Sequence, residues 1–417
     1  MTIDTNINIK NMKNNRKYNF TRGWLSGFTQ SDGSFTVVFD KRKTGLLIRP
    51  KPIFIITQHI SELELFKKMQ EHFGIGYITQ NKSNQSVSFL VTSLSQIDKV
   101  LIPIFDEHPL SHGKFKSYLM FKRIVKKMLN KEHLKLEGLL EIIESSYFIN
   151  KVTSLRTPES KEKLLDFLKD KHGTLLPLTG SDYISEIYEE MASFSPQPLS
   201  LDFVTGLIDG DGSFNISFQH KPTRRVRANF TVVQETSCRE LLNELKTFFG
   251  CGNVYDLPSA ASYQVNDIDT ILNKIVPIFN KVILNTKKNQ SYQTMVKVCE
   301  IIKAKGYESD ENYIEIIELA YDQNKSGKNL RLSKDMFIQK ISVADNALFC
   351  KSLKPQIQKR TISLMSHRLL SQIGPDQREA SEMFTESKLN PYFISGFVDG
   401  EGSFYLGMSQ NSKRSGG

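Results

Sequence analysis

Cysteine is scarce in this sequence, and its placement excludes two common kinds of stabilising site. The 417 residues contain four cysteines with no Cys-x-x-Cys pair, and all lie in the second half of the chain: Cys238, Cys251, Cys299 and Cys350. This pattern argues against a zinc module and against a disulfide framework. We therefore expect four reduced cysteines with structural roles, in a reducing compartment.

Long apolar runs are also missing. No stretch of about 18 or more apolar residues occurs, and the Asn- and Lys-rich segment Met1 to Tyr18 lacks the apolar core of a secretory signal. We therefore expect neither a membrane span nor a secretory signal. Hydrophobic residues make up 39% and charged residues 24% of the chain, which is typical of a soluble globular protein with room for two or three domains.

The charge balance is basic. Lys and Arg number 55 against 45 Asp and Glu, which gives a formal net charge of +10. A basic balance alone is weak support for a polyanionic partner, because many soluble proteins share it. Whether the partner is a polyanion must therefore be judged from the arrangement of the basic residues.

One short pattern occurs three times. Its copies are Trp24-Leu-Ser-Gly-Phe-Thr-Gln-Ser-Asp-Gly-Ser-Phe35, Val204-Thr-Gly-Leu-Ile-Asp-Gly-Asp-Gly-Ser-Phe214 and Ile394-Ser-Gly-Phe-Val-Asp-Gly-Glu-Gly-Ser-Phe404. In each copy a glycine is followed four residues later by a glycine or serine: Gly27 and Ser31, Gly206 and Gly210, Gly396 and Gly400. One face of each predicted helix therefore lacks bulky side chains, so two such helices can pack backbone to backbone.

Each copy ends in an acid. Asp32, Asp211 and Glu401 precede a glycine suited to a left-handed cap, so each carboxylate lies near the negative end of its helix dipole. If two of these helices pack side by side, two carboxylates meet, and such a pair is tolerated best when divalent cations bridge it. Ordinary Asp-Gly turn chemistry is the alternative, and it explains one copy better than three copies with the same flanks.

The motif opens a longer repeat. Gln58 corresponds to Gln234, and Phe73-Gly-Ile-Gly76 corresponds to Phe249-Gly-Cys-Gly252 at the same offset. Each copy predicts an apolar helix, a hairpin, an amphipathic helix, a second hairpin and further helices. The first helices are expected at about 18–32 and 198–211, and the amphipathic helices at about 61–73 and 237–249. This order predicts an α+β fold with helices on one face of an antiparallel sheet.

The predicted sheets have one polar and basic face. Alternate side chains of a strand share a face, so Arg49 and Lys51 lie opposite Phe54, and Arg225 and Arg227 recur at the matching positions. Such a face suits phosphates and base edges. The alternative, a merely solvated face, is weakened by this recurrence. The predicted DNA contacts are Thr36, Arg49, Lys51, Lys82, Asn215, Ser217, Gln219, Arg225 and Arg227.

These residues resemble the LAGLIDADG homing endonucleases, in the two-repeat monomeric form common in organellar introns. The resemblance covers about residues 20 to 340. It implies a saddle of two pseudo-symmetric α-β-β-α-β-β-α domains packed through their motif helices, with both sheets in the major groove of double-stranded DNA. It also implies that Mg²⁺, with Mn²⁺ as a substitute, is held by Asp32 and Asp211. The metal would assist hydrolysis of one phosphodiester per strand across the minor groove, leaving 3′ overhangs and promoting intron homing.

The resemblance carries further roles onto matching positions. Gln58 and Gln234 match the polar residue at the edge of the active site, where it would hold a water or the metal shell. Lys114 and Lys288 match the lysine of the catalytic centre, which would stabilise charge on the scissile phosphate. Gln30 departs from the pattern, which has an acid there, as at Asp209. We expect this change to affect helix packing rather than chemistry.

We expect five segments along the chain. A first domain spans 17–165, a linker 166–197, a second domain 198–342, a linker or poorly ordered segment 343–388 and a truncated third motif 389–417. The third motif continues for only 13 residues after Phe404, which is too short for a sheet. We therefore expect it to have no catalytic role.

Two other functions stay open on the sequence. The same fold occurs in RNA-binding maturases, which assist splicing of the host group I intron and would take intron RNA as partner, and in cleavage-dead DNA-binding proteins. Two intact Asp-Gly ends and both lysines favour the nuclease. We expect a monomer with no membrane partner. By resemblance, and from a composition rich in Asn, Lys, Ile and Phe, we expect synthesis in a mitochondrion.

Overall fold

The computed structural model describes residues 17–149, 157–173, 182–193, 197–219 and 224–323, together with 334 and 338. The chain divides into two compact units, of which the first holds residues up to Ile216 and from Arg227 to Ala304. The second holds Ser217–Val226 and the residues from Lys305 onward. Cys350, the segment 343–388 and the third motif at 389–417 lie outside the described residues.

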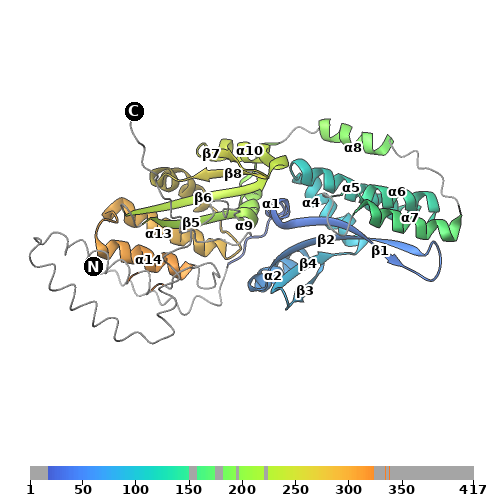
Figure 1. The fold of residues 1–417 in the computed structure, drawn as a ribbon, viewed down its shortest axis with the longest axis horizontal. Helices are drawn as coiled ribbons and strands as arrows, with labels where there is room; N and C mark the ends of the chain where they lie inside the picture. Colours follow the sequence, from blue (N-terminus) through green and yellow to red (C-terminus); the bar gives the residue numbers. More distant parts are fainter. Residues whose placement is uncertain are drawn as a thin grey trace, which may run out of the picture. The chain divides into compact units, whose positions relative to one another are not determined.

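The first repeat forms a four-stranded sheet with helices on one face (Figure 1). The strand order is β1-β2-β4-β3, with antiparallel neighbours throughout. The elements are α1 (Arg22–Asp32), β1 (Gly33–Lys41), β2 (Ile48–His59), α2 (Leu63–Phe73), β3 (Tyr77–Asn81), β4 (Ser86–Val91), α4 (Ile102–Glu107), α5 (His112–Leu129) and α6 (Leu136–Ser146).

The second repeat has the same order, and its sheet runs β5-β6-β8-β7. Its elements are α9 (Leu201–Asp211), β5 (Gly212–Gln219), β6 (Arg225–Glu235), α10 (Arg239–Phe249), β7 (Asn253–Asp256), β8 (Ala260–Val265), α12 (Val276–Phe279), α13 (Lys288–Lys305) and α14 (Asp310–Gln323). Between the repeats the chain forms α7 (Pro158–His172) and α8 (Asp182–Ser193). The predicted α+β class, with two antiparallel sheets, is confirmed.

The two motif helices begin a few residues later than expected. The Thr21 hydroxyl accepts the Trp24 N–H, and the Ser200 hydroxyl accepts the Phe203 N–H. Each hydroxyl thereby satisfies one of the free amides at a helix start. These N-caps fix the helix starts at Arg22 and Leu201.

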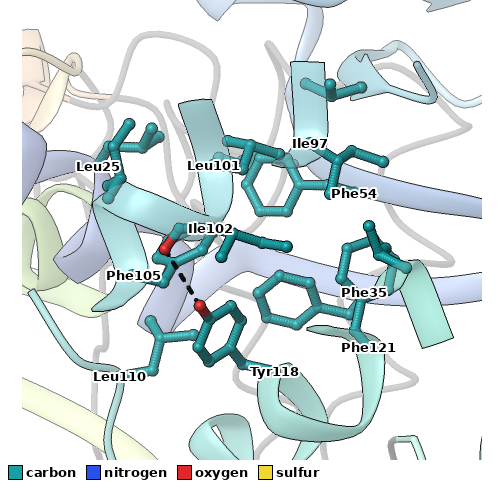
Figure 2. Close-up of a cluster of buried hydrophobic side chains, with 14 of the residues drawn as sticks. Leu25, Phe35, Phe54, Ile97, Leu101, Ile102, Phe105, Leu110, Tyr118 and Phe121 are labelled. Atoms are coloured by element: carbon teal, nitrogen blue, oxygen red, sulfur yellow. Dashed lines mark hydrogen bonds between the residues drawn. The ribbon is translucent and has the colours of Figure 1, made fainter. Parts of the chain in front are cut away.

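Aromatic side chains fill the space between each sheet and its helices. In the first repeat Phe35 and Phe54 pack against Phe105, Tyr118 and Phe121, with ring centroids 5.1 to 5.8 Å apart (Figure 2). The second repeat matches this cluster with Phe214, Phe230, Phe279 and Tyr292. The alternation predicted for the strands is therefore present, although Phe39 is only partly buried.

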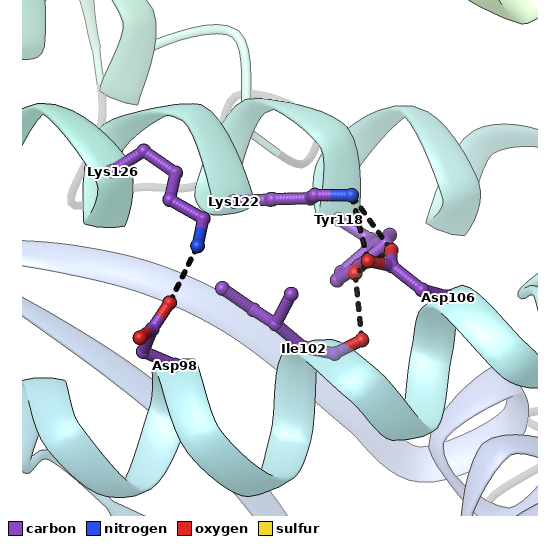
Figure 3. A network of polar contacts seen from close by, with 6 residues as sticks. All are labelled: Asp98, Ile102, Asp106, Tyr118, Lys122 and Lys126. Atoms are coloured by element: carbon purple, nitrogen blue, oxygen red, sulfur yellow. Dashed lines mark hydrogen bonds and ion pairs between the residues drawn. The ribbon is translucent and has the colours of Figure 1, made fainter.

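Ion pairs fasten α5 to the helical segment before it. Lys122 pairs with Asp106 at 2.8 Å and Lys126 with Asp98 at 2.6 Å, and the Tyr118 hydroxyl donates to the Ile102 carbonyl (Figure 3). Such partly exposed pairs contribute about 1 kcal/mol or less each. They matter for orientation, because α5 carries Lys114 in its first turn.

The second unit contains a smaller cluster of its own. Arg224 lies over the Tyr313 ring at 5.0 Å and pairs with Asp310, while Phe218 meets the same ring edge-on. Among the described residues of both units, no helix combines the length and the apolar character needed to cross a bilayer.

Candidate active site between the motif helices

The motif helices α1 and α9 touch backbone to backbone. A methyl group on Gly27 would overlap the carbonyl oxygen of Phe203, and one on Gly206 would overlap that of Trp24. No side-chain rotation relieves such a clash, because the obstacle is main chain. The predicted contact of small-residue faces is therefore present.

The glycines after the acids have a different role from the one expected. Gly33 and Gly212 adopt extended backbone with φ of −78° and −68°, so neither forms a left-handed cap. The prediction of a left-handed cap was wrong because in each repeat the chain passes directly from the helix into a strand. Glycine is still required, since a Cβ would lie 2.5 Å from Thr29 Cγ2 in one copy and 2.5 Å from Ile208 Cγ2 in the other.

Each motif acid accepts a hydrogen bond from the glutamine of its own sheet. Gln58 Nε2 donates to Asp32 Oδ2 at 2.6 Å, and Gln234 Nε2 donates to Asp211 Oδ2. Asp32 Oδ2 lies so close to Gly210 on the opposite helix that a Cβ there would approach it to 2.6 Å. The acids of the two halves are therefore brought to one place.

A lysine from each half completes the cluster. Lys114 Nζ donates to the carbonyls of Ser31 and Gly33, and Lys288 Nζ donates to the carbonyl of Gly210. The structure thus assembles six of the predicted site residues at the ends of the motif helices: Asp32, Asp211, Gln58, Gln234, Lys114 and Lys288. Their roles remain a prediction.

The charges in this cluster act on one another. Burial raises the pKa of Asp211 to about 7, with repulsion from Asp32 as the second cause, and burial also raises the pKa of Asp32. The lysine ammonium groups offset part of both shifts. Burial in turn lowers the pKa of Lys114 and of Lys288, while the two carboxylates oppose that change. The two acids are therefore held together against their mutual repulsion.

The donor set suits a hard divalent cation. It consists of the carboxylates of Asp32 and Asp211, because the nearby carbonyl oxygens of Ser31, Gly33 and Gly210 accept from the two lysines. In the part of the chain that the structure describes, no group of three His, Cys, Asp or Glu side chains is arranged to hold a metal. Mg²⁺ is commonly bound through one or two carboxylates, with waters and substrate phosphates as the other ligands. The residues present therefore fit Mg²⁺ when a phosphate supplies the missing ligands.

A tyrosine positions each lysine. Tyr118 and Tyr292 follow Lys114 and Lys288 by four residues, one helical turn away. The Tyr118 hydroxyl donates to the Ile102 carbonyl at 3.1 Å, and the Tyr292 hydroxyl donates to the Val276 carbonyl at 3.4 Å. These matched bonds tie the start of α5 and α13 to the preceding helix, and so fix where each lysine lies.

The sequence reasoning missed a buried polar network at the seam. Asp209 accepts hydrogen bonds from Trp24 Nε1 and from the backbone N–H groups of Asn285 and Thr286, each at 2.8 Å. In the other repeat Gln30 Oε1 accepts the Ser111 N–H at 2.8 Å. Both acceptors therefore tie a motif helix to the segment that leads to a lysine. The one signal in the sequence was a lone tryptophan, whose ring N–H needs an acceptor when it is buried.

The predicted DNA contacts lie where the strand alternation placed them. Arg49, Arg225 and Arg227 are exposed, and Lys82 is exposed in the turn between β3 and β4. Of the other five, Thr36, Lys51, Asn215 and Ser217 are partly exposed, and the side chain of Gln219 lies outside the described ones.

Comparison with known proteins gives a consistent result. The family model for LAGLIDADG endonuclease matches residues 25–125 and 204–299. A probable intron-encoded DNA endonuclease 1 of Mycosarcoma maydis is 38% identical over 275 residues, which covers 66% of this chain and 97% of that protein. Shorter matches are named for introns: Cox1-I1b of Schizosaccharomyces pombe (31% identity, 26% of this chain, 27% of that protein) and a protein in ND4 intron 1 of Podospora anserina (25%, 27% and 25%).

Solved structures match as well. The I-SmaMI LAGLIDADG homing endonuclease bound to cleaved DNA has a TM-score of 0.63 and 25% identity, and covers 76% of this chain and 100% of its own. I-SmaMI bound to an uncleaved DNA target in the presence of calcium ions has a TM-score of 0.62 and 25% identity, covering 73% and 99%. With the fold, the paired motif helices and these similarities in agreement, the chain belongs to the LAGLIDADG endonuclease family.

Proposed function

We propose that this chain is an intron-encoded, site-specific endonuclease that cuts both strands of duplex DNA with Mg²⁺ held by Asp32 and Asp211. The observation that carries the proposal is the meeting of these two partly buried acids at the ends of the packed motif helices. The relatives named as intron-encoded endonucleases, and the one solved on cleaved DNA, support it.

Charge balance explains why the cluster needs a cation when the protein binds DNA. When both acids are ionised and both lysines are protonated, the two negative and two positive charges cancel. Each scissile phosphodiester adds a negative charge to this partly buried place. When bound, Mg²⁺ would neutralise that charge, activate a water and stabilise the leaving oxygen.

The side chains then act as holders and positioners. The amides of Gln58 and Gln234 fix one oxygen of each carboxylate, so that Asp32 and Asp211 would be oriented to hold the metal. Lys114 and Lys288 exchange their carbonyl partners for phosphate oxygens and stabilise the charge that develops there. Each half supplies one acid, one glutamine and one lysine, so each half serves one strand.

The finer points of the proposal follow from the same arrangement and from family membership. The cuts fall across the minor groove and leave 3′ overhangs, and the sheet faces with Arg49 and Arg227 lie in the major groove. The working domains are 17–165 and 198–342, and the protein acts as a monomer that promotes homing of an organellar, mitochondrial intron. Mn²⁺ substitutes for Mg²⁺, because both favour oxygen ligands.

A randomised duplex library tests the proposal. The full chain is incubated with the library in Mg²⁺, where cut molecules are sequenced, and in Ca²⁺, where bound molecules are sequenced. Asp32→Asn and Asp211→Asn should keep binding in Ca²⁺ and should abolish cutting in Mg²⁺ or reduce it to nicking. Asp166→Asn, an exposed position on α7, serves as the control and should cut normally. Complete double-strand cleavage by the doubly substituted chain would refute the assignment.

The same material separates the alternative of an RNA-binding maturase. A maturase that does not use the two carboxylates should still promote splicing of its host intron after both are replaced. A nuclease without maturase activity shows no such splicing at any stage. A cleavage-dead DNA-binding protein would bind the library without cutting it in Mg²⁺ or Mn²⁺.

A further inference from the structure

The outer faces of the two sheets differ in chemistry at matched positions. Ile53, Ile55, Leu90 and Tyr77 form what we call the apolar row of the first sheet. The repeat aligns these four with Asn229, Thr231, Gln264 and Asn253, which we call the amide row of the second sheet; its one hydroxyl residue, Thr231, is only 9% exposed.

The strand pairing confirms this match. Leu90 pairs with Ile55 on one side and with Tyr77 on the other, and Gln264 likewise pairs with Thr231 and with Asn253. The two sheets therefore present the same geometry with opposite side-chain character.

The apolar row lies on the face away from the core. Phe54, Ile56 and Phe89 point into the core and are fully buried, while the neighbouring Ile55 and Leu90 are partly exposed. Tyr77 is 41% exposed. Contiguous exposed apolar side chains usually mark a binding surface, so this row needs an occupant.

Its neighbours on β2 identify the occupant. Residues 49, 51, 53 and 55 alternate onto the same outer face, so Arg49 and Lys51 flank the row at one end. At the other end of the strand the next residue on this face is the exposed Thr57, whereas Gln58, which bonds Asp32, shares the core-facing parity of Phe54 and Ile56. The row is thus continuous with the proposed phosphate contacts, and duplex DNA is the partner that this charge pattern fits. In the major groove, the apolar group that a base presents is the 5-methyl of thymine.

The amide row suits recognition of bases by hydrogen bonds rather than by apolar contact. Side-chain amides of Asn and Gln can donate to N7 and accept from N6 of adenine. Gln264 Nε2 donates to Ser262 Oγ at 3.1 Å, which orients its amide. Asn253 is exposed on β7, where its amide is open to a base edge.

We propose that the two sheets recognise their half-sites by different chemistry. The first sheet selects thymines through methyl contact with the apolar row, and the second selects base edges through hydrogen bonds to the amide row. This inference rests on the proposed function, since it divides base recognition between the two DNA-facing sheets.

The test uses the full chain and a duplex selected from the randomised library in Ca²⁺. Thymines of one half-site at a time are replaced by deoxyuridine, which lacks only the methyl group, and adenines by 7-deazaadenine, which lacks the N7 acceptor. Each lost methyl should weaken binding about three- to fourfold in one half-site only, as expected for one buried carbon. Each lost N7 in the other half-site should weaken binding about five- to tenfold.

Exchange variants show which sheet is responsible. Ile55→Thr with Leu90→Gln imports the residues of the second sheet and should remove the deoxyuridine effect. The matched control, Thr231→Ile with Gln264→Leu, should preserve that effect and remove the 7-deazaadenine effect. Each exchange uses residues already found at the same register in the other sheet, so both variants should fold, as near-native far-ultraviolet circular dichroism would show.

The outcomes separate this inference from the proposed function. Specific binding with equal deoxyuridine sensitivity in both half-sites, or with none, overturns the inference and leaves the endonuclease in place. The same holds if the Ile55 and Leu90 exchange leaves the deoxyuridine effect intact. A library that yields no bound duplex overturns both.

Discussion

Replacing Asp211 with asparagine should stabilise the fold above neutral pH while it destroys the proposed cleavage. The reason is the raised pKa of this carboxyl, which burial and repulsion from Asp32 bring to about 7. An acid with a raised pKa is ionised in the folded state only at a free-energy cost. Asparagine has nearly the same shape and carries no charge, so it removes that cost.

The magnitude follows from the shift. The pKa moves from 3.8 to about 7, and each unit corresponds to about 1.4 kcal/mol, which gives an upper bound of about 4 kcal/mol. The sign is set by linkage. The penalty is absent below pH about 4, where the carboxyl is protonated in both folded and unfolded chains. It grows as the pH rises toward 7 and is constant above that value.

Thermal denaturation between pH 4 and 9, in a chelator that removes divalent ions, measures the effect. Asp211→Asn and the native chain should melt together at pH 4, and the variant should melt several degrees higher at pH 8. Adding Mg²⁺ at pH 8 should raise the melting temperature of the native chain, because ligand binding stabilises the folded state. The difference in melting temperature between the native chain and Asp211→Asn should therefore become smaller. Asp166→Asn, an exposed control that keeps both acids, should melt with the native chain at both pH values and respond to Mg²⁺ as the native chain does.

Two results would show that this reasoning is wrong. If Asp211→Asn melts below the native chain at pH 8, the lysines and Gln234 stabilise the ionised carboxylate more than burial opposes it. If the variant is more stable by the same amount at pH 4 and pH 8, the gain comes from packing rather than from charge. Either result removes the electrostatic argument for a bridging cation.

Three further predictions concern the seam and the lysines. Asp209→Asn should destabilise the protein by about 1–3 kcal/mol in urea denaturation, since its new NH₂ group would face hydrogen-bond donors. Gly27→Ala should cost about 3 kcal/mol or more, or prevent folding, while Gly113→Ala, whose nearest neighbour would be 3.9 Å away, should change stability by less than about 1 kcal/mol. Lys114→Met should lower the cleavage rate by about 10²-fold or more with binding in Ca²⁺ unchanged; a normal cleavage rate would exclude the proposed role.

Much of the fold could be predicted from the sequence because it depends on short-range periodicity. Alternation at Phe35, Val37 and Phe54 marked the buried face of a sheet, and the four-residue spacing at Gly27 and Gly206 marked helix faces that could touch. In both patterns the spacing of the residues along the chain determines which side chains share a face. The class, the two sheets and the helix contact followed from them.

The details that failed depend on contacts between distant parts of the chain. The hydrogen bond from Trp24 to Asp209 joins residues 185 positions apart, and no local pattern pairs them. The conformation of Gly33 was mistaken because Asp-Gly at a helix end usually signals a left-handed cap, whereas here a strand begins at once. In both places tertiary packing decided among locally allowed states.

The two repeats agree at the seam and differ on the sheets, and the chemistry of DNA supplies a reason. Each strand of a duplex offers the same phosphodiester, so the residues proposed to act on it match between the halves: Asp32 and Asp211, Gln58 and Gln234, Lys114 and Lys288. The sequences of two half-sites are not bound by any such symmetry. The outer faces can therefore diverge, as the replacement of Ile55 and Leu90 by Thr231 and Gln264 shows, because side chains there do not hold the helices together. A duplicated domain in one chain thus permits one shared active site and two sheets that recognise different base sequences. The protein should therefore tolerate substitutions on the outer faces of its sheets far better than substitutions at Gly27 or Gly206.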